Sequence, residues 1–243
     1  MPITPAAAYD AVAAAYDTTF TRPVDLAENA LVFGPVRTWL HAHPAARVLD
    51  VGCGTGLFLD EAPLPPNRYV GLDVSPGMLA QARQKYPDYD FCLGDMADLS
   101  NFAPDTFGLV VNLFGSFSYA LDPAPVLADL ARVLQPGGRF VLMACTPRYT
   151  HRPSYILQQG PYAAPMRLWQ AGALLAAIRP LAPTVAVTRC VGLHALPDTV
   201  CAWVPARLVQ PVLWLEQQTW GRLAPSSCYF LVLEGVKSCL SAP

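Results

Sequence analysis

Short apolar runs alternate with amphipathic segments along the first 145 residues of this chain. Helix-start pairs stand between some of the runs: in Ser75-Pro76 and Asp122-Pro123 the polar side chain can cap a first turn that proline opens. Strands and helices in series predict a parallel sheet with right-handed crossovers and helices on both faces. The five runs that predict strands are residues 47–51, 68–73, 89–93, 107–113 and 139–144.

The segments on either side of this series follow other patterns. Residues 5–20 are alanine-rich and carry Tyr9-Asp10 and Tyr16-Asp17, seven positions apart, which places both tyrosines near one helical face. Residues 28–43 have the apolar spacing of an amphipathic helix. After Thr146 the alternation stops. The patterns there predict a proline- and tyrosine-rich stretch at 147–165, a helix at 166–178, a strand at 184–191, an apolar helical stripe at 204–221 and a last strand at 226–236.

These elements predict an α/β fold with a doubly wound, mostly parallel seven-stranded sheet and helical and loop elaborations. No internal repeat or low-complexity linker divides the chain, so we expect one domain over residues 1–243. Its expected parts are N-terminal helices that form a lid (1–44), a ligand-binding core (45–145), elaborations around the sixth strand (146–225) and the last strand (226–237).

Composition narrows the class of protein. Hydrophobic residues make up 53% and charged residues 14%, which predicts a large core, and the net charge of −2 gives no electrostatic reason to expect nucleic acid. The seven cysteines are scattered without a C-x-x-C pair, which favours neither zinc ligation nor a disulfide framework. No signal peptide is evident and no apolar run reaches about 18 residues, so we expect a cytoplasmic protein without stable membrane insertion.

The most informative stretch is an apolar strand that runs into a glycine-dense turn, Val48 to Leu57. Gly52, Gly54 and Gly56 stand at alternate positions, so a ligand can lie against bare backbone there, and Asp50 ends the strand. A helix opening at Thr55 or Gly56 would add a partial positive charge opposite the aspartate. The turn therefore suits a ligand with both an ammonium and a carboxylate, as S-adenosylmethionine (SAM) has.

A second carboxylate, Asp73, ends the next predicted strand, 21 positions after Gly52. An acid at that spacing can accept hydrogen bonds from both hydroxyls of a ribose. The alternative is that Asp73 caps the following helix, although Ser75 is better placed for that. The spacing D-x-G-x-G-x-G differs from the dinucleotide fingerprint G-x-G-x-x-G.

With these motifs, residues 47–144 resemble the class I SAM-dependent methyltransferases of the small-molecule type. Three later motifs follow in the order of that family: Gly94-Asp95-Met96, Asn112-Leu113-Phe114 and Leu134 to Gly138. The resemblance implies a Rossmann-like fold, SAM as the cofactor, S-adenosylhomocysteine as its product, and an enzyme that transfers methyl groups.

The resemblance also implies roles for individual residues. Asp50, Gly52, Cys53, Gly54 and Gly56 form the first motif. Val74 and Met78 line the adenine pocket, Asp95 faces the adenine amino group and Met96 packs on the ring. Asn112 and Leu113 meet the methionine portion. Tyr16 closes over the cofactor from the N-terminal segment, unless both tyrosines only pack a surface helix.

The acceptor is constrained mainly by missing motifs. The chain lacks the Asn/Asp-Pro-Pro-Tyr/Phe of DNA and protein-amide methyltransferases, and it has no evident carboxylate cluster for a metal ion, so we expect a small-molecule acceptor and no metal. Residues 192–198 are similar to segments of methyltransferases for quinone- or lipid-like acceptors, which favours an apolar or aromatic metabolite, methylated on N, O, S or C. The open alternatives are a protein or RNA methyltransferase and a SAM-binding protein without turnover, as a monomer or a homodimer.

A general base is needed only if the acceptor must lose a proton. The candidates are His194, His151 and Tyr119, with Asp198 behind them, all in or next to the elaborations. The sequence does not choose among them.

Overall fold

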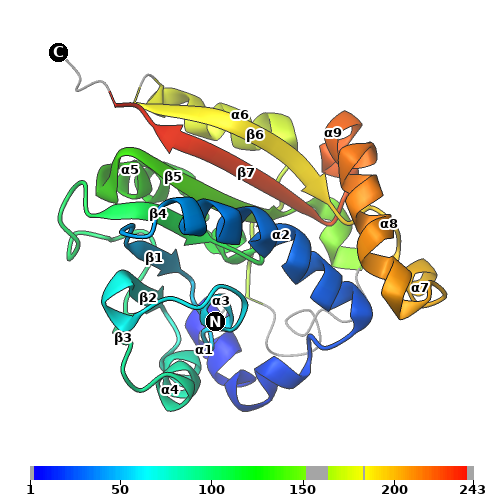
Figure 1. The fold of residues 1–243 in the computed structure, drawn as a ribbon, viewed down its shortest axis with the longest axis horizontal. Coiled ribbons are helices and arrows are strands. Elements are labelled where there is room, and N and C mark those ends of the chain that lie inside the picture. Colours follow the sequence, from blue (N-terminus) through cyan, green and yellow to red (C-terminus); the bar gives the residue numbers. More distant parts are fainter. Residues whose placement is uncertain (1–2, 152–163, 183, 240–243) are drawn as a thin grey trace.

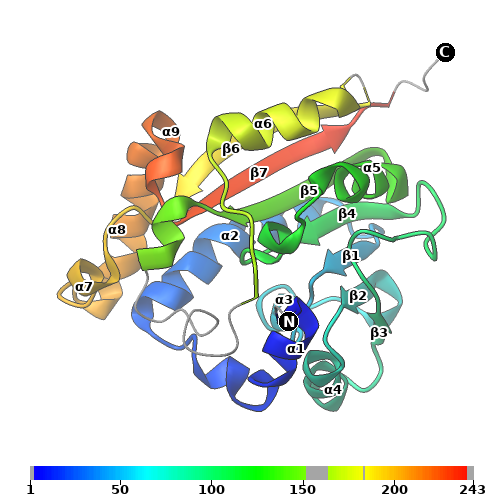
Figure 2. The ribbon, with the colours of Figure 1, turned by 180° about the vertical axis from the view of Figure 1, so that it is seen from behind.

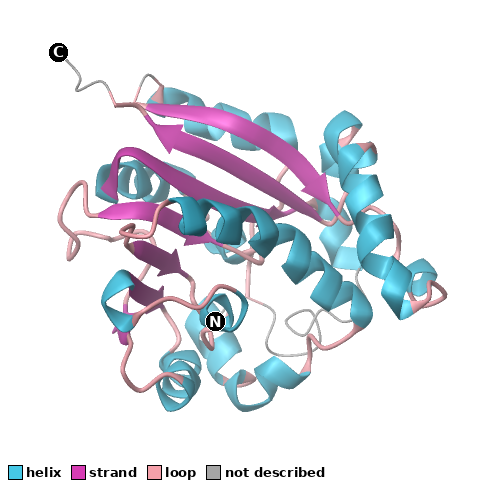
Figure 3. Ribbon diagram, in the orientation of Figure 1, coloured by secondary structure: helices cyan, strands magenta, loops and turns pink. Residues whose placement is uncertain are grey.

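The computed structural model describes residues 3–151, 164–182 and 184–239, and within them a single mixed sheet is flanked by helices on both faces (Figure 1, Figure 3). The strands are β1 (Val48–Val51), β2 (Tyr69–Asp73), β3 (Asp90–Leu93), β4 (Phe107–Asn112), β5 (Leu134–Cys145), β6 (Val185–Leu193) and β7 (Phe230–Lys237). The α-helices are α1 (Pro5–Asp10), α2 (Pro23–Ala42), α3 (Leu57–Glu61), α4 (Pro76–Lys85), α5 (Pro123–Val133), α6 (Ala171–Ile178), α7 (Asp198–Cys201), α8 (Ala206–Gln218) and α9 (Trp220–Leu223).

The sheet order is β3-β2-β1-β4-β5-β7-β6. All neighbours pair in parallel except β7, which runs antiparallel to β5 and to β6. The predicted α/β fold with a doubly wound, mostly parallel seven-stranded sheet is therefore confirmed. The chain winds from β1 outward to β3 and then returns to β4 beside β1, so the winding reverses between β1 and β4. Open sheets of this kind bind ligands at that reversal, beyond the carboxyl ends of the strands.

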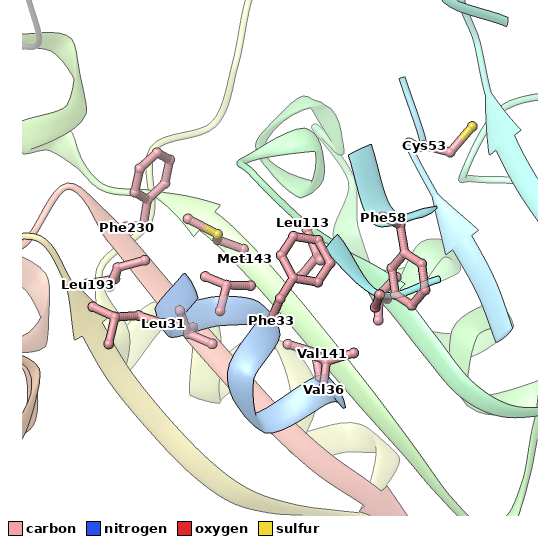
Figure 4. Packing of buried hydrophobic residues seen from close by; sticks show 14 of the residues in the cluster. Leu31, Phe33, Val36, Cys53, Phe58, Leu113, Val141, Met143, Leu193 and Phe230 are labelled. Atoms are coloured by element: carbon pink, nitrogen blue, oxygen red, sulfur yellow. The ribbon is translucent and has the colours of Figure 1, made fainter. Parts of the chain in front are cut away.

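Two hydrophobic cores form, one on each face of the sheet. Every residue of β1 and of β4 is buried, as expected for central parallel strands that are covered on both sides. On one face α2 packs through Leu31, Phe33 and Val36 against residues of β5, β6 and β7 (Figure 4). The opposite face carries α5 and α6, which are in front when the molecule is seen from behind (Figure 2).

Several element boundaries differ from the predicted ones for local reasons. Helix α2 begins at Pro23 rather than residue 28, because the Arg22 backbone N–H donates to Asp25 Oδ2 at 3.1 Å and caps an earlier first turn. The segment 5–20 is divided into α1 and a 3₁₀ helix, η1 (Ala13–Thr18). The helix expected at 166–178 is shorter and begins at Ala171. The capping by Ser75 and by Asp122 is confirmed.

Candidate functional site

The glycine turn after β1 has the backbone geometry that its sequence predicts. Gly52, Gly54 and Gly56 all have positive φ angles, +77°, +54° and +90°. The N–H groups of Gly52 and Cys53 donate to the Leu72 carbonyl at 2.7 and 3.0 Å, which fastens the turn to β2. A Cβ atom at Gly54 would meet nothing within 4 Å, so this backbone faces open space. Helix α3 spans only five residues, so its contribution of positive charge is small.

Two carboxylates flank the turn. Asp73 accepts hydrogen bonds from the Gly54 N–H at 2.8 Å and from the Ser75 N–H at 2.9 Å. Asp50 is buried and accepts a hydrogen bond from the Tyr69 hydroxyl at 2.8 Å. Burial raises the pKa of Asp50 to about 7, and burial also raises the pKa of Asp73. A cationic group bound beside Asp50 would favour its ionised form.

These groups line one cavity at the carboxyl ends of β1, β2 and β4. Most of the predicted cofactor residues line it too: Tyr16, Asp50, Gly52, Cys53, Gly54, Asp73, Val74, Met78, Met96 and Leu113. The cavity thus brings together residues that are separated by up to 97 positions (16 to 113) in the sequence.

Three predicted cofactor residues do not line the cavity. Gly56 is the N-cap of α3, where a Cβ would approach the Tyr86 ring to 3.1 Å. Asn112 is buried and accepts a hydrogen bond from Ser116 Oγ at 2.7 Å, so it shapes the turn after β4. Asp95 is exposed, and its Oδ1 accepts the Ala97 N–H at 2.9 Å, next to the lining residue Met96.

The N-terminal segment, residues 5–20, closes one side of the cavity. Tyr9 and Tyr16 both line it, with ring centroids 6.0 Å apart, although they lie on separate short helices rather than on one. The aspartate after each tyrosine fastens the segment to the core. Asp10 accepts from Ser75 Oγ at 2.5 Å and from the Gly77 N–H at 2.7 Å. Asp17 accepts from Thr55 Oγ1 at 2.5 Å, within the glycine turn itself.

Aromatic rings from five separate stretches of chain also line the cavity, and we call this part of the lining the aromatic end. Its members are Phe20, Phe33, Phe114, Tyr119, Tyr149 and Phe230. The Tyr9 hydroxyl lies 3.4 Å from the Tyr119 hydroxyl, which joins this end to the N-terminal segment. Polar side chains of α2, Asp25, Glu28 and Asn29, line the cavity as well. This end accommodates an apolar or aromatic molecule that carries a polar group.

His194 is not among the described residues that line the cavity. Its side chain is buried, with Nδ1 donating to Glu28 Oε1 at 2.5 Å and Nε2 lying 3.4 Å from Cys201 Sγ. The Tyr229 ring packs edge-on against the imidazole. His194 stays a candidate base, and in the structure its imidazole contacts Glu28, which lines the cavity.

The other candidate bases differ in whether they line the cavity. Tyr119 lines the cavity. Asp198 is buried away from it and accepts from Arg22 Nη1 at 2.8 Å, and the same guanidinium also holds Asp25. The side chain of His151 lies outside the described residues.

Sequence reasoning missed Glu28 and the aromatic residues of this end. Glu28 falls on the helical stripe of Leu31 and Val32, so a carboxylate on the apolar face of α2 was the available signal. The aromatic residues carry no comparable signal, because only the tertiary fold brings them together.

The cavity fits SAM by the chemistry of its lining. The bare backbone at Gly54 leaves room for a ligand, Asp50 can face an ammonium, and Asp73 can accept hydrogen bonds from a ribose while it still holds the turn. Within the described residues, no group of three or more histidine, cysteine, aspartate or glutamate side chains is arranged to hold a metal ion. Nor is any described helix long and apolar enough to cross a membrane.

Comparison with known proteins identifies the same region of the chain. The family profile of the methyltransferase domain matches residues 49–142. The chain is 35% identical over 144 residues to the demethylmenaquinone methyltransferase of Renibacterium salmoninarum, covering 56% of each chain. It is 32% identical over 133 residues to the malonyl-[acyl-carrier protein] O-methyltransferase of Serratia marcescens, covering 55% of this chain and 49% of that one. The match thus spans about half the length of these curated relatives.

The fold is also found among solved structures. A SAM-dependent methyltransferase from Mesorhizobium loti superposes with a TM-score of 0.57 at 22% identity, covering 79% of this chain and 91% of that chain. Fold, glycine turn and matched domain agree. Residues 49–142 are thus a methyltransferase domain of the class I SAM-dependent type.

Proposed function

We propose that this protein transfers a methyl group from SAM to a small, apolar or aromatic acceptor. One observation carries the proposal: a single cavity is lined both by the glycine turn with Asp50 and Asp73 and by the aromatic end with Glu28. A cofactor and an acceptor could therefore meet inside one enclosure, shielded from water.

The lining suggests how SAM is held. Asp73 accepts hydrogen bonds from the ribose hydroxyls, and Asp50 faces the ammonium group. Val74, Met78 and Met96 supply apolar surface for the adenine ring, and Asp95 stands at its edge. Tyr16 covers the ligand from the N-terminal segment, and Leu113 lies beneath the methionine portion. Cys53 and Gly54 offer bare turn backbone.

When bound, SAM supplies a methyl group on a sulfonium, which is already strongly electrophilic. The protein mainly has to hold the acceptor atom in line with it and exclude water. Orientation of this kind lowers a barrier by roughly 7–11 kcal/mol. The aromatic end would do this by packing the body of the acceptor between rings from α2, the turn after β4, and β7.

An O–H or N–H acceptor must also lose a proton, and we propose Glu28 as the group that receives it. Glu28 is buried, lines the cavity, and has one oxygen held by His194 Nδ1 at 2.5 Å. His194 is then a positioning residue that fixes the carboxylate. Tyr119 remains the second candidate because it also lines the cavity, and His151 remains a prediction.

The relatives support a small acceptor of this type. The names of the two relatives describe methylation of demethylmenaquinone, a quinone, and of an acyl group on a carrier protein. The aromatic end favours a ring compound over an extended polar chain. A protein or RNA acceptor, and SAM binding without turnover, are the alternatives.

The proposal is tested by incubating the purified protein with methyl-tritiated SAM and, separately, with the small-molecule, protein and RNA fractions of a cell extract. We expect tritium to enter an organic-soluble product with release of an equal amount of S-adenosylhomocysteine. Tritium recovered only in protein or RNA would favour a protein or RNA methyltransferase. Tight SAM binding without any release of S-adenosylhomocysteine would favour a SAM-binding protein without turnover.

A further inference from the structure

The end of the molecule formed by α7, α8 and α9 carries apolar side chains on its outside. In Figures 1 and 2 these helices stack as a column at the edge of the fold, beyond the ends of β6 and β7. Trp203 is 89% exposed and Leu223 82%, and Trp214 and Trp220 are more than half exposed. We call residues 199–227 the outer helical edge.

Helix α8 has apolar residues on both of its sides. Val209 and Leu213 face inward and belong to the core that contains α2. Leu208, Trp214 and Leu215 are exposed on the other side, where a helix of a water-soluble protein normally carries polar side chains. Folding alone does not account for this second apolar stripe, because these side chains contribute little to the core.

The exposed charged side chains of the outer helical edge are all positive. It contains three charged residues, Arg207, Glu216 and Arg222. Glu216 is buried and accepts the Leu196 N–H at 2.7 Å, so it presents no negative charge to the outside. Both arginines are exposed, and neither forms an ion pair with another described residue. This edge is therefore basic although the chain as a whole has a net charge of −2.

Protruding tryptophan and leucine side chains with arginines and no exposed carboxylate match the interface of a negatively charged bilayer. Tryptophan rings are enriched at the headgroup level of membranes, and basic residues are attracted to anionic lipid. Side chains that protrude nearly free of their neighbours can enter a fluid interface without a complementary hole, which a rigid protein partner would have to provide.

The edge is also connected to the wall of the cavity. Arg22 joins Asp198, at the start of α7, to Asp25, which lines the cavity. His194, just before α7, holds Glu28 in the same wall. A membrane bound at this edge would therefore lie close to residues that are connected to the aromatic end of the cavity.

We infer that the outer helical edge docks on the surface of anionic lipid membranes, with Trp203, Trp214 and Trp220 in the headgroup region and Arg207 and Arg222 on lipid phosphates. The docking is peripheral and reversible, and it does not depend on catalysis.

The test is flotation of the full-length protein with vesicles of phosphatidylcholine alone and with vesicles that also contain phosphatidylglycerol. We expect binding to the anionic vesicles, with a blue shift of tryptophan fluorescence, and weak binding to the neutral ones. W203Q/W214Q/W220Q should lose binding at least tenfold and lose the blue shift. R207Q/R222Q should weaken binding to anionic vesicles about 25-fold, roughly fivefold for each arginine removed.

The matched control is L93Q/L121Q, which removes two exposed leucines elsewhere on the surface and should bind like the wild type. Unchanged melting temperature and SAM affinity would show that each variant is folded. Failure of the wild type to float, or wild-type binding by the triple tryptophan variant, would overturn the inference. So would a dimer in light scattering that the triple variant splits into monomers, because a second copy would then cover the edge.

Discussion

The two ends of the cavity are built in different ways. At the cofactor end, the glycine turn and its two carboxylates lie at the ends of β1 and β2, and Asp73 reaches Gly54 across only 19 positions. At the aromatic end, the side chains come from positions as far apart as Phe20 and Phe230. Bare backbone suits a ligand of fixed shape, whereas a wall of separate side chains can change by single substitutions. Under the proposed function, the acceptor is therefore specified by the less local part of the fold.

The N-terminal segment joins the two ends. Its tyrosines face the cavity, while Asp10 and Asp17 hold the α4 start and the glycine turn. Lys85 also donates to Asp17 at 3.0 Å. The cover is thus fastened to the cofactor end and reaches over the aromatic end through the Tyr9–Tyr119 contact.

The largest effect is expected at the bare backbone. Gly54→Val should abolish SAM binding measured by calorimetry, because its side chain would occupy open space that we assign to the cofactor. The positive φ should cost about 1–2 kcal/mol of stability without unfolding the protein. Gly137→Val has the same kind of φ, +76°, but lies outside the cavity lining, so it should lose stability and keep SAM affinity. Tight binding by Gly54→Val would contradict the assignment.

A change at the aromatic end should separate catalysis from cofactor binding. Glu28→Gln should lower kcat for an O–H or N–H acceptor by about 10²–10⁴-fold, since the proton loses its acceptor. SAM affinity should stay within about twofold, because Glu28 is not at the cofactor end. His194→Asn, which tolerates the positive φ of 62° at this position, should lower kcat less and leave KM unchanged. Normal turnover by Glu28→Gln would return the role of base to Tyr119 or His151.

The raised pKa of Asp50 should make the stability of the protein depend on pH. The pKa of Asp50 is about 7 in the folded protein against 3.8 as its ordinary value, so the folded state holds this proton more tightly than the unfolded chain. The free energy of unfolding should therefore fall as the pH rises from about 4 through 7. In urea titrations without SAM, the wild type should lose about 2–3 kcal/mol of unfolding free energy between pH 5 and 8. Asp50→Asn should not show this loss. Parallel pH curves for both proteins would contradict the raised pKa.

Loss of the proposed contact between Asp73 and the ribose should change the free energy of SAM binding by an amount similar to or smaller than the Asp50 effect on stability. Asp73→Ala should weaken SAM binding roughly 10- to 150-fold, the range for hydrogen bonds to a charged group. Because Asp73 also holds the Gly54 and Ser75 N–H groups, the melting temperature should be recorded as well. Unchanged affinity in a folded variant would remove Asp73 from the site.

The smallest effect is expected at Asp95. It is exposed and does not line the cavity, yet its position beside Met96 keeps it within the predicted adenine edge. Asp95→Ala should weaken SAM binding about fivefold, the value of one ordinary hydrogen bond. No change in calorimetry would leave adenine recognition to Val74, Met78 and Met96.

The same contrast explains what could be predicted from the sequence. Strand periodicity, the Ser75 and Asp122 caps and the D-x-G-x-G-x-G spacing are local, so the sheet and most of the cofactor end followed from short windows. Glu28 was missed because its role depends on His194, 166 positions away. No pattern in the sequence shows that the imidazole of His194 is buried against Glu28. The division of residues 5–20 into α1 and η1 depends equally on distant partners, since Asp10 and Asp17 bind Ser75 and Thr55.

A crystal structure of the protein with S-adenosylhomocysteine would show directly whether this cavity holds the cofactor. We expect density along residues 50–56, with the ribose hydroxyls on the Asp73 carboxylate and the amino group facing Asp50. A fully occupied ligand at any other place, or none at concentrations that saturate related methyltransferases, would contradict this expectation.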